Sequence, residues 1–280
     1  MKQSLLSRLS QEADVKLDRL LYVSEHASSF YKIYRIPKRN GGQRTIAHPS
    51  RELKAIQRWL EFVVLSDLPI HDSATAYRRG GSIRLNAERH RKTSYTTRID
   101  FRNFFPSFSE SRIRLFLEHL VVQGKISLSS EDIKFFVNCA TRYGQLTIGA
   151  PISPSLTNAM MFEFDTKMQD QCTSRGLVYT RYADDIFISS FKPKHIGNAT
   201  RFVSAARRDL NYLSLRINHQ KTAYLSRRNR RTITGVVITP DLRLSIGRER
   251  KRFFRALVHS FTQGQLDLDM SLKLRGYLSF

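Results

Sequence analysis

The stretch VYTRYADDIFI, residues 178–188, places two adjacent aspartates, Asp184 and Asp185, between β-branched and aromatic residues. Aspartate is depleted in strands, and a buried carboxylate must be paired with a cation or bound to a metal ion. We therefore predict a tight hairpin that holds both acids at its turn for a divalent metal. Two acids in a turn also fit an ordinary solvated loop, so the hairpin alone leaves both interpretations open.

The charge of the chain indicates a polyanionic partner. Its 280 residues include 47 basic and 24 acidic ones, which gives a formal net charge of +23. This excess of positive charge attracts nucleic acid, and it is unusually large for an enzyme that acts on small molecules. The charge is spread along the whole chain, as expected of several lobes that line a groove. A ribosomal or membrane-surface protein would share the charge but would not need the acid pair.

The remaining composition predicts a folded protein of the reducing cytoplasm. A hydrophobic content of 41% in a chain of this length is sufficient for a real core. Cys139 and Cys172 have no metal-ligand spacing and form no disulfide framework, so we expect reduced thiols. The N-terminus lacks the apolar core of a signal peptide, and no segment approaches the roughly 20 apolar residues of a membrane span. We expect no membrane partner.

Hydrophobic periodicity predicts a mixed α+β protein without internal repeats or long linkers. The helices are expected within 3–30, in the second half of 76–90, and at 52–65, 109–123, 129–142, 155–171, 196–213 and 246–262. The strands are expected at 31–36, 43–47, 96–101, 215–218, 222–226 and 232–239, besides the hairpin at 178–190.

Asp100 is a second key acid, because it lies at the end of the predicted strand 96–101. Alone, it could be a helix N-cap or an ordinary acid at a strand end. If it meets Asp184 and Asp185 on one sheet face, the three carboxylates would repel one another without cations. Oxygen ligands of this kind favour Mg²⁺, with Mn²⁺ as a substitute. Two ions roughly 3.5–4 Å apart could activate a 3′-hydroxyl and stabilise a leaving pyrophosphate.

Three segments together resemble the motifs of reverse transcriptases. Tyr182-Ala183-Asp184-Asp185 is similar to their catalytic box, and Asp100 with the following FFPS, residues 104–107, resembles the preceding motif. The loop GAPISP at 149–154 resembles the third. Order and spacing agree as well, over about residues 31–260.

Two shorter signatures resemble those of bacterial retron reverse transcriptases. The segment NAERH at 86–90 is similar to their Asn-Ala-x-x-His motif, and ITG at 233–235 to their Val-Thr-Gly motif. The resemblance implies a right-hand polymerase with fingers, a palm built on an antiparallel sheet, and a short helical thumb. Residues 1–95 would form N-terminal helices and fingers, and 96–240 the palm with inserted fingers helices at about 109–145. Residues 241–280 would form a thumb that is short or completed by a partner or bound RNA.

The resemblance assigns the catalytic and nucleotide-binding roles. Asp100, Asp184 and Asp185 would be catalytic metal ligands, joined by the backbone carbonyl of Phe101. Phe105 would block a ribose 2′-hydroxyl, although plain core packing also explains a phenylalanine there. The remaining nucleotide-binding residues would be Lys38 and Arg44 on the basic hairpin, Gly149 and Pro151 beneath the templating base, and Lys221 near the pyrophosphate.

The basic hairpin could instead be merely solvated, and Lys221 an ordinary surface lysine. Ile148 departs from the family, because most relatives carry glutamine there to contact the nucleotide. The residues implied in binding nucleic acid are Arg78, Arg79, Asn86, His90, Gly235, Arg248, Lys251, Arg252 and Arg255. Asn86 and His90 could equally be a satisfied polar pair that supports a loop.

The resemblance implies an RNA-directed DNA polymerase that binds its own structured non-coding RNA and uses dNTPs. It would prime from the 2′-hydroxyl of an internal guanosine and make branched single-stranded DNA (msDNA). Retron enzymes are linked to antiphage defence with an accessory effector protein. A group II intron or diversity-generating reverse transcriptase is an alternative, as is a non-catalytic RNA-binding scaffold of the same fold. The intact acids count against the scaffold, because unused carboxylates would weaken binding of a polyanion.

Overall fold

The N-terminal part combines helices with a long hairpin in the computed structural model, which describes residues 3–37, 41–193, 196–226 and 231–278. Helices α1 (Leu5–Ala13) and α2 (Leu17–Glu25) precede the antiparallel strands β1 (Tyr31–Pro37) and β2 (Gln43–Pro49). Helix α3 (Arg51–Leu60) follows and continues as a π-helical turn over Glu61–Leu65. The helices and the hairpin expected here are confirmed.

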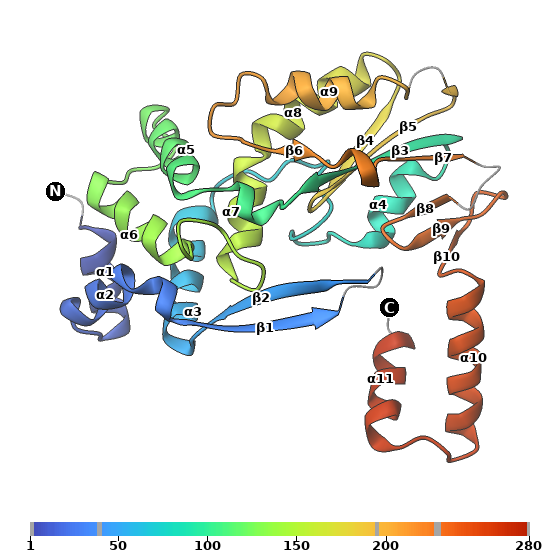
Figure 1. Ribbon diagram of the computed structural model, residues 1–280, viewed down its shortest axis with the longest axis horizontal. Helices are drawn as coiled ribbons and strands as arrows, with labels where there is room; N and C mark the ends of the chain where they lie inside the picture. The colour runs from blue at the N-terminus through green and yellow to red at the C-terminus, as the bar shows by residue number, and fades with distance from the viewer. Residues whose placement is uncertain (1–2, 38–40, 194–195, 227–230, 279–280) are drawn as a thin grey trace.

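The centre of the molecule is a five-stranded antiparallel sheet (Figure 1). Its strands follow the order β4-β5-β3-β6, and β7 also pairs with β3. Strands β4 and β5 form the predicted hairpin around the acid pair. The strands are β3 (Tyr95–Arg102), β4 (Val178–Tyr182), β5 (Asp185–Ser190), β6 (Arg216–Ile217) and β7 (Ala223–Ser226).

Both faces of this sheet are covered, because alternate side chains of a strand point to opposite sides. Ile186 and Ile188 belong to the main core, whereas Phe187 between them packs in a second cluster with Ala87 and Ile233. The main-core face carries α8 (Phe162–Thr173) and α9 (Ala199–Arg207), and the other face carries α4 (Ile83–His90) (Figure 1).

Helix α6 (Ser130–Ala140) packs against α5 (Glu110–Val122) and the N-terminal helices, whereas α7 (Ile152–Met160) packs against α3 and α8. The single helix predicted at 155–171 is in fact two, α7 and α8, separated at Met161. Helix α7 also begins inside the predicted loop at 149–154. Pro154 is tolerated there, since the first turn of a helix does not use its N–H groups.

The strand predicted at 232–239 is a hairpin, formed by β8 (Arg231–Ile233) and β9 (Val236–Ile238). Thr234 and Gly235 both have positive φ, 47° and 86°, as a two-residue hairpin turn requires. Strand β10 (Leu244–Ser245) pairs with β9 and completes a small three-stranded sheet.

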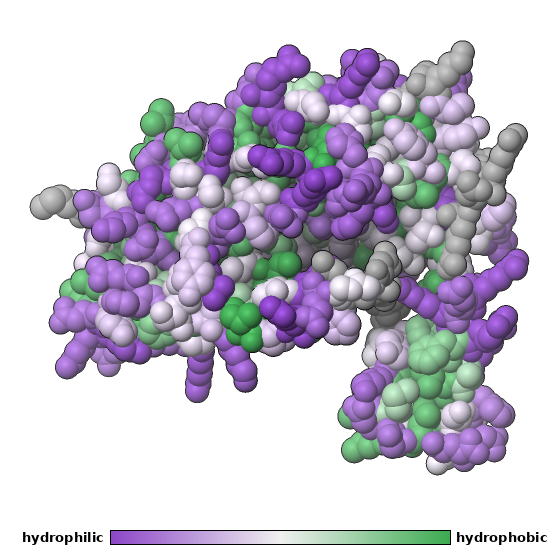
Figure 2. All heavy atoms as spheres, viewed as in Figure 1, coloured by the Kyte–Doolittle hydropathy of each residue, from purple (hydrophilic) through white to green (hydrophobic). Residues whose placement is uncertain are grey.

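The C-terminal helices α10 (Arg248–Thr262) and α11 (Leu268–Leu278) form a pair that projects from the body beyond β10 (Figure 1). Helix α10 was predicted, whereas α11 was not. Leu257 and Leu274 are their buried residues, and Figure 2 shows apolar side chains gathered on the exposed face of the pair. The boundaries given above for fingers, palm and thumb stay a prediction. Within the described residues, no helix is long and apolar enough to cross a membrane.

Candidate active site

The three predicted acids meet at one end of the central sheet. Strands β3 and β5 pair so that Asp100 lies directly opposite Asp185. The N–H of Phe101 donates to the carbonyl of Asp184 at 3.3 Å, which ties the turn to β3. Since residues opposite each other share a face and alternate with their neighbours, both carboxylates lie on the face away from the main core.

The turn between β4 and β5 depends on an unusual backbone at Ala183. Its φ is 55°, in the left-handed region that residues other than glycine rarely adopt. The carbonyl of Ala183 accepts a hydrogen bond of 3.2 Å from a guanidinium nitrogen of Arg181. The side chain of Arg181 thus supports the backbone that presents Asp184 and Asp185.

Arg181 is itself held by a buried ion pair. Its Nη2 lies 2.6 Å from Oδ2 of Asp165 on α8, and its Nε donates to Oδ1 at 2.9 Å. Asn158 accepts from Arg181 at 3.1 Å, and the hydroxyl of Tyr179 donates to Asp165 at 2.6 Å. Burial, followed by the charge of Asp165, raises the pKa of Tyr179 well above its ordinary value, so its proton stays in place. This cluster fixes β4 to α7 and α8 beneath the turn.

Sequence reasoning missed Arg181 and Asp165. The available signal was Arg181 as the single charged residue of the strand segment 178–182, and Asp165 at helical spacing from the apolar Met161 and Met168. Charged residues are rarely fully buried unless they are paired.

Two polar side chains from the segment after β6 bind the carboxylate of Asp100. Asn218 donates to Oδ1 at 3.1 Å, and the ammonium of Lys221 lies 3.2 Å from Oδ2. The carboxylate is nearly buried, whereas the Lys221 side chain is 60% exposed. The structure thus places the exposed ammonium group of Lys221 beside Asp100, the most buried of the three acids.

Burial and mutual repulsion raise the pKa values of the acid pair. Burial raises the pKa of Asp185 to about 6, and the charges of Asp184 and Asp100 add to this, against the opposing effect of Arg98. Burial also raises the pKa of Asp184, as does Asp100, while Lys221 and Arg44 act in the opposite direction. Burial is thus the main cause of both shifts, and Arg98, Arg44 and Lys221 offset part of the repulsion among the acids.

This donor set fits a divalent cation by chemistry and charge. Magnesium prefers carboxylate oxygens and usually keeps several waters, so it does not require a closed protein cage. In the described part of the chain, no three His, Cys, Asp or Glu side chains are gathered closely enough to form one coordination set. The acids share one edge of the sheet, and Asp100 binds Asn218 and Lys221.

Comparisons with known proteins agree with this geometry. The family model described as reverse transcriptase (RNA-dependent DNA polymerase) matches residues 36–238. The chain belongs to the reverse transcriptase family. It is 33% identical to the Retron Ec83 reverse transcriptase of Escherichia coli, over 96% of this chain and 87% of that protein. It is 31% identical to the Retron Ec86 reverse transcriptase of Escherichia coli, over 98% and 83% respectively.

Solved structures show the same fold at much lower identity. The apo telomerase from Candida tropicalis, truncated from its C-terminal domain, has a TM-score of 0.52 and 14% identity. The match covers 81% of this chain and 59% of the telomerase chain, so this protein spans less than two thirds of it. The retron relatives and the family match make this reverse transcriptase an RNA-directed DNA polymerase of the retron type.

The residues predicted to bind the nucleotide are brought together only in part. Arg44 is exposed on β2, yet near enough to lower the pKa of Asp184. Phe105 is half-buried, with its ring centre 6.5 Å from that of Tyr77. Pro151 directly precedes α7. Lys38 lies outside the described residues.

Gly149, which was predicted to lie beneath the templating base, is required by packing within the protein. Its φ is 112°, and an added Cβ would lie 2.7 Å from the carbonyl oxygen of Ala47 and 2.9 Å from Cγ2 of Ile46. The N–H of Ala47 also donates to the carbonyl of Ile148 at 2.8 Å. The backbone of Ile148 thus helps to fasten β2 to the loop before α7.

Asn86 and His90 have no exposed surface, which favours the structural alternative over direct contact with RNA. Thr180 donates to Oδ1 of Asn86, and its oxygen lies 2.7 Å from Nε2 of His90. Asn86 also donates to Thr234 at 3.4 Å, within the signature around Gly235. The two retron signatures therefore bind each other and strand β4, and they fix α4 to the β8–β9 hairpin.

His90 is held neutral by this environment. Because Thr180 gives its hydrogen to Asn86, Nε2 of His90 must be the donor to Thr180, which leaves Nδ1 unprotonated. No described residue bonds Nδ1. Burial, with the charges of Arg231 and Arg89 adding to it, lowers the pKa of His90 to about 3.

We expect His90 to make stability depend on pH below about 6.5. The unfolded chain takes up a proton near pH 6.5, whereas the folded protein does so only near pH 3. The contribution of His90 to the free energy of unfolding is therefore complete above pH 6.5. It decreases as the pH falls toward 3, by up to roughly 1.4 kcal/mol per pH unit. Urea unfolding at pH 7.5 and 5.5 should show a smaller loss in His90→Gln. The exposed His48→Gln is the control, and an equal loss in all three proteins would contradict the assignment.

The other residues predicted to bind nucleic acid divide into two groups. Arg78 is bound within the protein, with Nη1 at 3.1 Å from Asp72 and 3.2 Å from the carbonyl of His71. Arg79 is exposed on the same loop. Exposed side chains on α10 form the second group, Arg248, Lys251, Arg252 and Arg255.

Proposed function

We propose that this reverse transcriptase copies part of a structured non-coding RNA into branched single-stranded DNA. Synthesis would start from the 2′-hydroxyl of an internal guanosine of the same RNA. The observation that carries the proposal is the pairing of Asp100 opposite Asp185, next to the supported turn at Ala183. The similarity to retron reverse transcriptases supports branched DNA as the product.

The proposed metal ligands are Asp100, Asp184 and Asp185, with the backbone carbonyl of Phe101. Bound Mg²⁺, or Mn²⁺ in its place, would supply activation of the attacking hydroxyl and neutralisation of charge on the leaving pyrophosphate. We propose two ions, one for each of these two roles. Lys221, within 3.2 Å of Asp100, is placed to donate a proton to the pyrophosphate.

The proposed substrate contacts follow from exposure and position. Arg44 on β2 and Lys38 would bind the triphosphate, Phe105 would exclude the ribose 2′-hydroxyl, and Pro151 would shape the templating site. The basic residues of α10 would contact duplex phosphates, because arginine and lysine supply most such contacts. The retron assignment also supports an accessory effector protein and a role in antiphage defence.

The test starts from the nucleic acid that copurifies with the protein. We expect a branched RNA–DNA species, and we expect the purified protein with the corresponding RNA, Mg²⁺ and dNTPs to extend it into cDNA. Debranching enzyme should release the DNA from the RNA. Linear cDNA would contradict the branched product, and an absence of any cDNA would contradict the polymerase assignment.

A further inference from the structure

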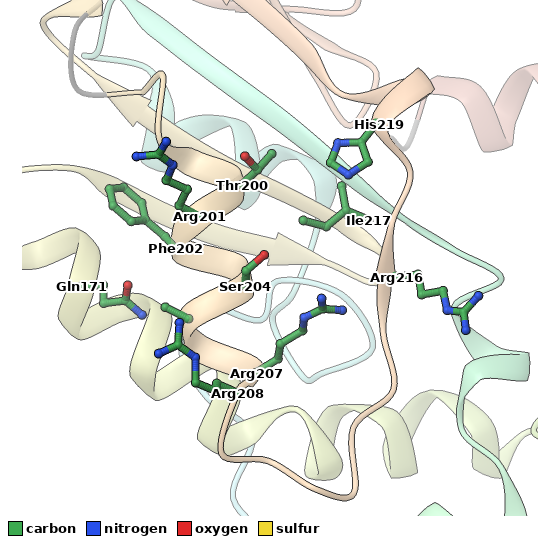
Figure 3. A pocket seen from close by; sticks show the side chains of 11 residues that line it. Gln171, Thr200, Arg201, Phe202, Ser204, Arg207, Arg208, Arg216, Ile217 and His219 are labelled. Carbon is green, nitrogen blue, oxygen red and sulfur yellow. The ribbon is translucent and has the colours of Figure 1, made fainter.

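A groove of about 630 Å³ lies on the outside of the sheet, between α9 and the segment that begins with β6. We call it the α9–β6 groove. Figure 3 shows Thr200 and Ser204 on α9, Arg207 extending toward β6, and Ile217 and His219 on the opposite wall.

The groove opens on the opposite side of the sheet from the catalytic acids. Phe101 and Ile217 are paired across β3 and β6 and both belong to the main core, on the same side as α9. Asp100 points the other way, because it alternates with Phe101 along the strand. The groove is therefore separate from the site where nucleotides would be joined.

The chemistry of the groove suits a phosphate. Arg201 and Arg208 are exposed at its rim, and no described carboxylate forms an ion pair with either of them. Asp209, the nearest acid along the chain, is paired with Lys167 at 3.3 Å. Thr200 and Ser204 add hydroxyl donors on the side of α9 that faces β6 (Figure 3). Guanidinium and hydroxyl groups are the usual protein contacts to phosphate oxygens.

Strand β6, at the edge of the groove, and its neighbour β3 carry two positive charges opposite each other. Arg216 on β6 lies directly opposite Arg102 on β3, and both side chains are exposed. Like charges opposite each other destabilise a pair of strands unless an anion lies between or beside them. Because these arginines alternate with Phe101 and Ile217, their side chains point to the other face of the sheet, and Figure 3 shows Arg216 pointing away from α9.

We propose that the α9–β6 groove binds the phosphodiester backbone of the RNA outside the polymerase cleft and so anchors the RNA to the enzyme. The proposal rests on the proposed function for the presence of a cognate RNA. Arg201 and Arg208 are seven residues apart, about 10 Å along the helix, which suits a chain of phosphates better than one small anion. A free triphosphate or pyrophosphate shares this chemistry, and the test distinguishes it.

The test compares two double variants with the same change of charge. Arg201→Gln/Arg208→Gln removes the two positive charges at the rim of the groove. Arg51→Gln/Arg58→Gln is the control, because these exposed arginines have the same spacing on α3. Binding of the copurifying RNA is measured by filter retention at 50–300 mM salt, and extension of a generic oligonucleotide template–primer is measured in parallel.

We expect the groove variant to bind the RNA about tenfold more weakly and to lower the slope of log K against log salt by about two. Its extension of the generic template–primer should stay unchanged, as should binding by the control. Equal RNA binding by the groove variant and the wild type would overturn the proposal. So would an equal loss in the control, or a raised KM for dNTPs with normal RNA binding. A wild type that makes no cDNA would instead contradict the proposed function.

Discussion

Asp184→Asn is expected to abolish cDNA synthesis, by about a thousandfold or more. Asparagine keeps the shape of the side chain but removes one charge from the acids that would hold the metal ions. Neutralisation of transition-state charge by metal ions supplies several kcal/mol, which corresponds to this loss in rate. The variant should fold normally, since burial already raises the pKa of Asp184 and disfavours its charged form. Incorporation of labelled dNTPs on the cognate RNA measures the effect.

The matched control is Asp170→Asn, which changes an exposed aspartate on α8 in the same way. It should keep wild-type activity and RNA binding. Asp184→Asn should also keep RNA binding, because the acids repel a polyanion rather than attract it. Synthesis by Asp184→Asn at the rate of the control would remove Asp184 from the active site.

Arg181→Met is expected to destabilise the protein by roughly 3–5 kcal/mol. The change leaves Asp165 as an unpaired charge in the core, and loss of one partner of a buried ion pair has a cost of this size. It also removes the donor to the carbonyl of Ala183. Urea unfolding measures the loss, and Arg58→Met, on an exposed arginine of α3, is the control.

A second variant separates stability from the position of the turn. Replacing both partners of a buried ion pair by apolar residues of similar volume is often neutral, so Arg181→Met/Asp165→Leu should regain much of the stability. It should not regain activity, because Ala183 with its positive φ still lacks the supporting hydrogen bond. The concentration of Mg²⁺ for half-maximal synthesis should rise as well. Full activity in a stable double variant would show that Arg181 serves packing alone.

Local patterns were sufficient to select Asp100, Asp184 and Asp185 as candidate catalytic acids, and Asp100 and Asp185 do lie opposite each other in the sheet. Asp184 and Asp185 break a strand pattern, and Asp100 ends a predicted strand. Only together do the three acids favour a metal site over an ordinary solvated turn. Short-range chemistry also predicted most helices and both hairpins around residues 37–43 and 182–185. The hairpin at Thr234 was missed, because a threonine with positive φ gives no turn signal in the sequence.

The roles of buried polar residues could not be predicted in the same way. Gly149 has no side chain because strand β2, about a hundred residues earlier, passes within 2.7 Å of where its Cβ would be. Asn86 and His90 looked like candidates for RNA contact, and only the fold shows that they are enclosed beside Thr180.

The sequence by itself determined the class of chemistry, since the acid pair, its upstream partner and the +23 charge already indicate a metal-dependent enzyme of nucleic acid. The tertiary structure alone decided how the acids are held. Folding brings Arg181 within 2.6 Å of Asp165 and buries both side chains, and their attraction is strong because water no longer screens it. No pattern along the chain predicts that these two residues come so close together. The α9–β6 groove arises in the same way, from side chains that only the packing of a helix beside a strand brings together.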